Sequence, residues 1–124
     1  MKKNILLKFL FTFFLFSNLI AEEISFYDSK GAAVAYIDTD DELTIYLWQG
    51  KPVAYLVGDS IYGFNGKHLG WLEGGIIRDH SGNAVGFIKG SVNMITQFES
   101  FKGFKAFKPF KAFQEFAPLK PFYS

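Results

Sequence analysis

The segment IYLWQGKPVAYL, residues 45–56, is followed by a second segment of the same pattern, IYGFNGKHLGWL, residues 61–72. In both, a Gly follows the first Ile by five residues, and an aromatic residue follows that Gly by five more. Two looser copies surround Gly31 and Gly82, so four units follow one another at spacings of 19, 16 and 16 residues. Such regular spacing is typical of a repeat protein in which each unit is one supersecondary element.

Seven columns agree when the four units are aligned on their Gly residues. Two columns precede the Gly: an apolar one, Phe26, Ile45, Ile61 and Ile77, and a mostly Tyr one, Tyr27, Tyr46, Tyr62 and Arg78. Four columns follow it. The first is Val or Leu (Val34, Val53, Leu69, Val85) and the second is small (Ala35, Ala54, Gly70, Gly86); the third is aromatic (Tyr36, Tyr55, Trp71, Phe87) and the fourth is Ile or Leu (Ile37, Leu56, Leu72, Ile88). The Gly column, Gly31, Gly50, Gly66 and Gly82, is the seventh. Agreement over so many columns indicates an internal repeat.

Each unit reads as a β-hairpin. The runs on both sides of the Gly are short, aromatic and β-branched, as strands are. The Gly falls in a tight turn, and Asn65-Gly66 is the strongest hairpin signal because both residues tolerate positive φ. Short polar or Gly links join the units, which predicts eight strands from about residue 24 to residue 88 and an all-β fold.

The columns also predict how the units assemble. Successive strand residues face opposite ways, so the small column shares a face with the Ile/Leu column, and the aromatic column lies on the other face. Both faces are apolar, so the second strand of each hairpin should be buried on both sides. Four small residues in one column permit close backbone approach and are candidates to line a common axis. Closure around that axis would hide the sheet edges.

The two segments quoted first resemble the bacterial 4-fold beta flower family. The similarity covers roughly residues 24–91, and the runs KPVAY (51–55) and NGKHLGW (65–71) are its most specific parts. The resemblance implies four hairpin petals around a pseudo-fourfold axis and transfers no catalytic residues. The first and last units depart most from the pattern, with Asp28, Asp79 and Arg78 at positions where the central units have apolar residues, Gly or Tyr.

From residue 92 the pattern changes to a period of three. An apolar residue recurs at every third position in Val92, Ile95, Phe98, Phe101, Phe104, Phe107, Phe110, Phe113, Phe116, Leu119 and Phe122, with Lys next to it at 102, 105, 108, 111 and 120. Polyproline II has three residues per turn, so residues 92–124 are predicted to form an extended Phe/Lys/Pro tail. We expect this tail to wrap the body with its Phe column inward and its Lys outward; an anionic membrane is the second choice of surface, and a nucleic acid is disfavoured by export.

Charge supports a tail held by the body. Residues 22–91 contain five Lys or Arg against ten Asp or Glu, a balance of −5, whereas residues 92–124 contain five Lys against two Glu, a balance of +3. An acidic body and a basic tail attract one another.

The N-terminus predicts export. Lys2, Lys3 and Lys8 precede and enter an apolar run, and Ala21 is a small residue before two Glu, the layout of a signal peptide spanning residues 1–21. The mature chain would then comprise the four-hairpin domain, 22–91, and the tail, 92–124, in the periplasm or outside the cell. With no Cys in the chain, a disulfide, a Cys nucleophile and a lipid-linked Cys are all excluded.

No catalytic motif accompanies these features. His68 and His80 occupy different columns of the repeat, so they are not paired by symmetry and read as turn or surface residues. Ser60 has no evident His or Asp partner, and the acidic link Asp38, Asp40, Asp41, Glu42 lacks the order of an EF-hand loop. We therefore expect no cofactor and no metal site.

The sequence favours a monomeric, non-enzymatic structural or binding module of the cell envelope; a small secreted hydrolase or toxin with an unrecognised site is the alternative. Trp48 and Phe64 stand beside turn Gly residues, where large rings are hard to bury, and are expected to be exposed. The candidate binding residues are Trp48, Phe64, Lys102, Lys105, Lys108 and Lys111. The expected partner is an envelope protein, a glycan or an anionic membrane surface. An enzyme should instead gather His80 with Asp79 or Asp28 in one cleft.

Overall fold

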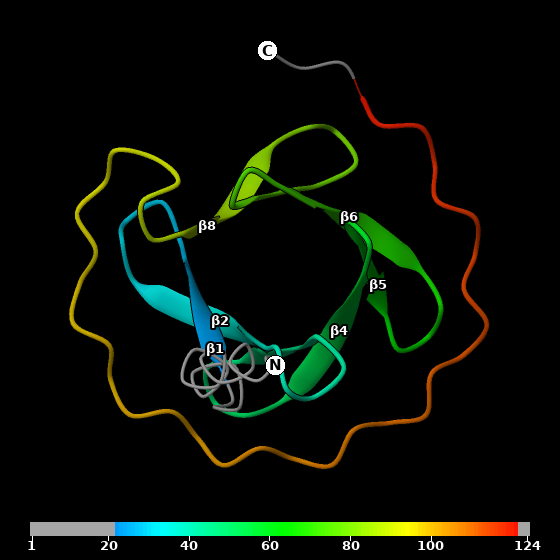
Figure 1. Cartoon of the computed structure of the whole chain (residues 1–124), viewed down its shortest axis with the longest axis horizontal. Coiled ribbons are helices and arrows are strands. Elements are labelled where there is room, and N and C mark those ends of the chain that lie inside the picture. Colours follow the sequence, from blue (N-terminus) through cyan, green and yellow to red (C-terminus); the bar gives the residue numbers. More distant parts are fainter. Residues whose placement is uncertain (1–21, 122–124) are drawn as a thin grey trace, which may run out of the picture.

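The computed structural model describes residues 22–121; the predicted signal peptide lies outside the described residues. Eight strands follow one another, β1 (Glu23–Tyr27), β2 (Ala33–Asp38), β3 (Thr44–Leu47), β4 (Pro52–Val57), β5 (Ser60–Gly63), β6 (His68–Glu73), β7 (Ile76–Arg78) and β8 (Ala84–Ile88). Each pairs antiparallel with the next, and β8 returns to β1, so the sheet closes on itself (Figure 1). The all-β prediction and the four hairpins around one axis are confirmed.

Each hairpin, which we call a petal, carries the same β-bulge. In the first petal Phe26 pairs with Ala35 while Tyr27 pairs with Ala33, so Val34 is the extra residue. The same register shift leaves Val53, Leu69 and Val85 as extra residues in the other petals. A bulge sharpens strand twist and bends the strand. Its repetition at one column gives all four petals the curvature that closure requires.

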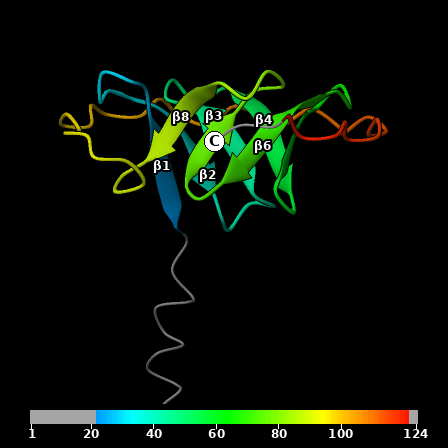
Figure 2. The same ribbon diagram turned by 90° about the horizontal axis from the view of Figure 1, so that it is seen from above.

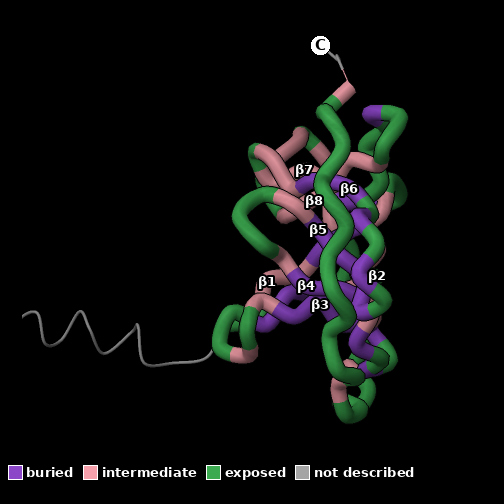
Figure 3. Tube along the Cα trace, turned by 90° about the vertical axis from the view of Figure 1, so that its right-hand side faces the viewer, coloured by how far each residue is buried: buried purple, intermediate pink, exposed green. Residues whose placement is uncertain are grey.

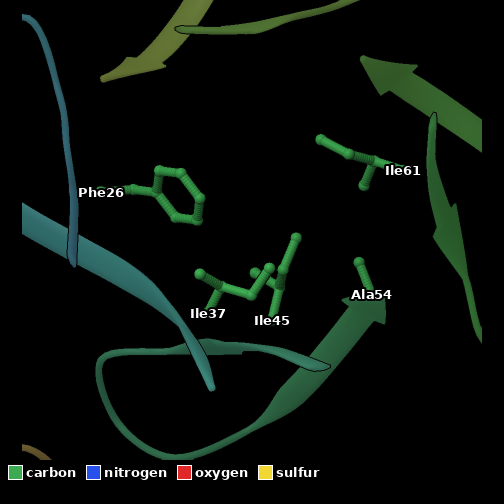
Figure 4. Packing of buried hydrophobic residues seen from close by; sticks show 5 residues of the cluster. All are labelled: Phe26, Ile37, Ile45, Ala54 and Ile61. Carbon is green, nitrogen blue, oxygen red and sulfur yellow. The ribbon is translucent and has the colours of Figure 1, made fainter. Parts of the chain in front are cut away.

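The barrel interior holds aliphatic side chains and one aromatic ring. Phe26, Ile37, Ile45, Ala54 and Ile61 form one buried cluster, and their side chains converge on the axis in Figure 4. Ile37 and Ala54 come from the two columns expected to share a face, whereas Phe26, Ile45 and Ile61 come from the first strands of their petals, for which no face was predicted. The closed sheet leaves no free edge that another chain could extend.

The outer surface of the barrel is aromatic. Tyr36, Tyr46 and Trp48 form one buried cluster against the first two petals. Tyr55, Tyr62 and Phe64 form a second cluster further round. Tyr36 stacks on Tyr46 with ring centroids 5.4 Å apart. The barrel therefore buries rings on its outside as well as aliphatic groups on its inside, which requires a cover over its outer face.

The tail supplies that cover. It runs around most of the barrel without regular secondary structure (Figure 1), at nearly constant height when the molecule is seen from the side (Figure 2). In Figure 3 its exposed trace passes in front of buried strand residues. Within residues 22–121 no helix is long and apolar enough to cross a membrane.

The link between the first and second petals, residues 39–43, is the longest of the three. Glu42 and Leu43 both adopt φ of 56°, in the left-handed region where non-Gly residues are uncommon. Gly58 and Gly74 hold similar angles in the later links. The extra residues bring Asp41 and Glu42 to the barrel rim, where they meet the tail.

Candidate functional site

The tail presents three faces, each repeated every three residues. We call Glu99, Lys102, Lys105, Lys108, Lys111, Gln114 and Lys120 the inner face, because these side chains contact the barrel. Gln97, Gly103, Ala106, Ala112 and Glu115 form the tip face, whose backbone N–H groups meet the petal turns. Ile95, Phe98, Phe101, Phe104, Phe107, Phe110, Phe113, Phe116 and Leu119 form the belt.

The tip face is held by main-chain hydrogen bonds. The N–H of Gly103 donates to the carbonyl of Trp48, and that of Ala106 donates to the carbonyl of Gly50, both at 2.9 Å. The next petal repeats this pair: Ala112 donates to Phe64, and Glu115 donates to Gly66. Equivalent donors stand nine residues apart, which is three turns of a three-residue helix. The tail thus advances nine residues per petal.

The inner face is held by ion pairs with the barrel. Lys102 Nζ lies 2.6 Å from Glu23, Lys105 contacts both Asp38 and Glu23, and Lys108 lies 2.7 Å from Asp41. The side chain of Asp38 is only 6% exposed, so this pair is the most shielded of the set.

The acidic link is therefore filled by tail lysines. Lys108 also contacts Glu42 at 3.1 Å, and Lys111 lies 3.6 Å from the same carboxylate. Among the described residues no group of three His, Cys, Asp or Glu side chains is arranged to hold a metal ion.

The pairs shift the pKa values of both partners. The hydrogen bond from Lys102 lowers the pKa of Glu23, and that from Lys108 lowers the pKa of Asp41. The hydrogen bond to Asp38 raises the pKa of Lys105, and the one to Asp41 raises the pKa of Lys108. Each ionised partner thus favours the ionised form of the other.

The same ammonium groups cover the outer aromatic clusters. Lys102 Nζ lies 4.5 Å from the ring centroid of Tyr36, and Lys105 Nζ lies 5.4 Å from that of Tyr46. Lys111 Nζ lies 4.3 Å from the Tyr55 ring. Cation–π attraction is strongest where the cation sits over a ring within about 6 Å. The lysines of the inner face therefore bind a surface that consists of Tyr rings with carboxylates beside them.

Polar contacts hold the tail to the barrel near both of its ends. Tyr27 donates to Glu99 at 2.7 Å near the start, and Lys120 lies 2.5 Å from Asp59 and also contacts Glu73 near the end. The hydrogen bond from Tyr27 lowers the pKa of Glu99, and that from Lys120 lowers the pKa of Asp59.

Wrapping was predicted correctly, but the predicted orientation of the tail is wrong. The belt side chains are 90–102% exposed, and the lysines point inward. The physical reason is that the outer surface of the barrel is already covered by its own aromatic clusters, while its carboxylates remain to be paired. The tail is bound by charge and backbone hydrogen bonds, and its Phe rings contribute nothing to its own docking.

The expected exposure of Trp48 and Phe64 is also wrong. Each is only 9% exposed, because the tail passes over the petal turns beside them. The Trp48 indole N–H donates to the Ser100 carbonyl at 3.2 Å. The structure thus gathers Trp48 and the four candidate lysines at the seam between tail and barrel, whereas the free surface is the belt.

Two histidines and a serine form a chain of contacts that the column argument missed. His68 Nδ1 lies 2.8 Å from His80 Nε2, and His68 Nε2 lies 3.1 Å from Ser60 Oγ. The bulge at Leu69 turns His68 to the outer face, where it meets the turn of the next petal. Burial, followed by the charge of His80, lowers the pKa of His68, so this imidazole is neutral at pH 7.

Docking of the tail should depend on pH at both extremes. Carboxylates whose pKa is lowered by docking, such as Glu23, stabilise the docked state fully at pH values above their ordinary pKa of 3.8–4.5. Their stabilisation is lost as the pH falls through the lowered pKa of the docked state. Lysines whose pKa is raised by docking stabilise the docked state fully below pH 10.5, their ordinary pKa. Their stabilisation is lost as the pH rises through the raised pKa of the docked state. The indole N–H resonance of Trp48 should therefore keep its position between about pH 5 and 10. A shift within that window, at constant salt, would contradict the assignment.

Comparison with known proteins agrees with this architecture. The model of the family described as 4-fold beta flower protein matches residues 24–124, so the match extends beyond the hairpins and through the tail. No curated protein and no solved structure matches the chain. With four bulged petals in a closed sheet and a family match over both petals and tail, the chain belongs to the 4-fold beta flower family.

Proposed function

We propose that this protein is an exported, non-enzymatic module that binds an envelope membrane through its belt. The observation that carries the proposal is the full exposure of nine apolar side chains in one row along the tail. So many fully exposed large apolar side chains are rare on monomeric proteins, and such apolar surface marks a site of interaction. The predicted signal peptide supports export, which would bring the belt to a membrane of the envelope.

The composition of the belt favours lipid over a specific protein surface. It consists of seven Phe flanked by Ile95 and Leu119, with no polar group among them. Specific protein interfaces mix aromatic residues with Arg, Tyr and hydrogen-bonding groups. Phe rings, in contrast, insert readily at the boundary between headgroups and acyl chains.

The shape of the belt points the same way. The tail that carries the belt runs around most of the barrel (Figure 1), and the belt side chains are exposed along it, so one partner can cover the belt only by surrounding the protein. Lipids in a leaflet surround a disc-shaped protein on all sides. A second copy meeting it edge to edge would touch one or two rings and leave the others in water.

The lysines do not attract the membrane in this arrangement, because they already pair with the barrel. Binding should therefore depend on apolar insertion, with a weak dependence on anionic lipid. An envelope protein or glycan that forms a concave collar would be the alternative partner.

Sedimentation with vesicles tests the proposal. The chain of residues 22–124 should co-sediment with phosphatidylcholine vesicles, with or without phosphatidylglycerol. Replacing Phe104, Phe107, Phe110 and Phe113 with Ser should reduce the partition coefficient by about tenfold or more, since burying one Phe is worth about 1.5–3 kcal/mol.

The control replaces Val34 and Val57, exposed on the barrel, with Ser, and should bind as the unmodified protein does. A wild-type chain that stays in the supernatant, or a four-Ser variant that binds equally well, would overturn the proposal. An unchanged Trp48 indole resonance in the variant would establish that its tail is still docked.

A second function has one observation in its favour. Ser60, His68 and His80 are connected as a nucleophile, a base and an orienting group would be. This arrangement would suit the alternative of a small hydrolase. A fluorophosphonate probe labels an activated serine, so labelling of the protein that disappears in Ser60→Ala would favour the hydrolase over the membrane module.

A further inference from the structure

The barrel contains a cavity of about 200 Å³ that opens between the petals. Its walls are formed by Ile45, Ala54, Ile61 and Ile77, and its rim by Leu69 and Val85. The rim side chains are 47% and 52% exposed, so the cavity is accessible from solvent.

The repeat explains why the cavity exists. Its lining comes from the second, third and fourth petals. The first petal has Phe26 where the others have Ile45, Ile61 and Ile77, and Figure 4 shows the Phe26 ring pointing across the axis. One large ring thus fills its own side, while three smaller side chains leave space on the other side. The bulges place Leu69 and Val85 at the mouth of that space.

The two polar residues along the cavity are both engaged within the fourth petal's turn. The Arg78 guanidinium donates to the Gly82 carbonyl at 2.8 Å. The Asp79 carboxylate accepts from the backbone N–H groups of Ser81 and Asn83 at 3.0 and 2.9 Å. The remaining walls are aliphatic, and ordered water in a cavity needs two to four polar partners. The cavity therefore suits an apolar occupant better than water.

We infer that this cavity binds the methyl end of an unbranched acyl chain. An apolar cavity of about 150 Å³ holds a benzene molecule, so about 200 Å³ accommodates a terminal segment of several carbons. An open mouth suits a linear chain, because its polar head can stay in water while its end is buried. A free fatty acid and the acyl chain of a phospholipid share this chemistry. The inference does not depend on the belt.

Methyl NMR of the chain of residues 22–124 tests the inference. Decanoate, below its micellar concentration, should cause saturable shifts at the methyl groups of Ile45, Ile61 and Ile77. A soluble short-chain phosphatidylcholine, titrated separately, distinguishes the two sources of the acyl chain. Shifts with either ligand support the inference; shifts restricted to the belt, or none that saturate, would overturn it.

Two variants locate the site. Val85→Trp closes the mouth and should weaken decanoate binding at least tenfold, whereas Val57→Trp, a similarly exposed position outside the cavity, should leave it unchanged. Ala54→Leu fills the cavity from within and should have the same effect as Val85→Trp. Unchanged affinity in a folded Val85→Trp protein would contradict the assignment. The Val85→Trp protein should still bind vesicles, so loss of decanoate binding at the cavity can be distinguished from loss of membrane binding by the belt.

Discussion

Replacing Lys105 with Glu should release the middle of the tail from the barrel while the barrel stays folded. Lys105 pairs with Asp38, whose carboxylate is nearly buried, and with Glu23 at 3.0 Å. The substitution removes the cation and places a third carboxylate beside these two. A hydrogen bond to a charged group contributes about 1.5–3 kcal/mol, and repulsion adds to the loss. The partial exposure of Lys105 keeps the effect below that of a fully buried pair.

Lys111→Glu is the matched control. It makes the same chemical change on the same face of the tail and, like Lys105, removes an ammonium from above a Tyr ring, but its ionic partner Glu42 is 68% exposed and 3.6 Å away. Exposed pairs of this kind contribute less than about 1 kcal/mol, so the tail should remain docked. Hydrogen exchange at Gly103 and Ala106, whose N–H groups bind the second petal, measures the difference. Equal exchange rates in the two variants would show that charge does not hold the tail.

Replacing Gly103 with Val should detach the tail from the second petal by a different route. A Cβ at this position would lie against the backbone carbonyl of Gln49, well inside van der Waals contact. That carbonyl cannot move aside easily, because the turn is closed by the hydrogen bond from Gly50 to Leu47 at 2.8 Å. The clash should cost about 1–3 kcal/mol of docking free energy.

Gly103 is not among the residues with positive φ, so Val is not strained in a released tail. The loss should therefore appear in tail docking and not in the thermal stability of the barrel. Ala106→Val is the control, since Ala106 already carries a Cβ and binds the same petal through its N–H. Limited proteolysis should cut the tail of Gly103→Val faster than that of Ala106→Val; similar rates would contradict the close approach.

Both changes also bear on the belt. Its rings face outward because the opposite face of the tail is fixed to the barrel at each of the first three petals. A released tail keeps the same Phe residues but loses their arrangement in a ring. If membrane binding depends on that ring, the Lys105→Glu protein should bind vesicles less cooperatively than the unmodified chain.

The fold was largely determined by local sequence. The Gly column predicted turns, and its positive φ values of 84° to 104° agree with that prediction. The alternation of the flanking residues predicted which side chains of a strand share a face. Small residues at Ala54 and Gly70 indicated an axis, and both line the cavity there. These features repeat with strand and turn geometry, so they could be read without knowledge of distant contacts.

The bulges and the histidine contact were decided by pairing between strands. The one-residue shift at Leu69 changes which side His68 faces and brings it to His80 in the next petal. A column alignment places these histidines at different positions and so separates them. Their distance depends on how neighbouring petals lie side by side, which no single unit contains.

The sequence alone determined that the tail has three faces and an attraction to the acidic body; only the tertiary structure decided which face turns inward. A period of three fixes the relative directions of Phe and Lys but leaves the rotation of the whole tail open. That rotation is chosen by the surface beneath it. The barrel buries its own rings, Tyr36, Tyr46 and Tyr55, and presents their faces together with the carboxylates of Glu23 and Asp38. Ammonium groups stabilise such a surface more than Phe does, because unpaired buried carboxylates are costly, and so the Phe rings are left facing outward.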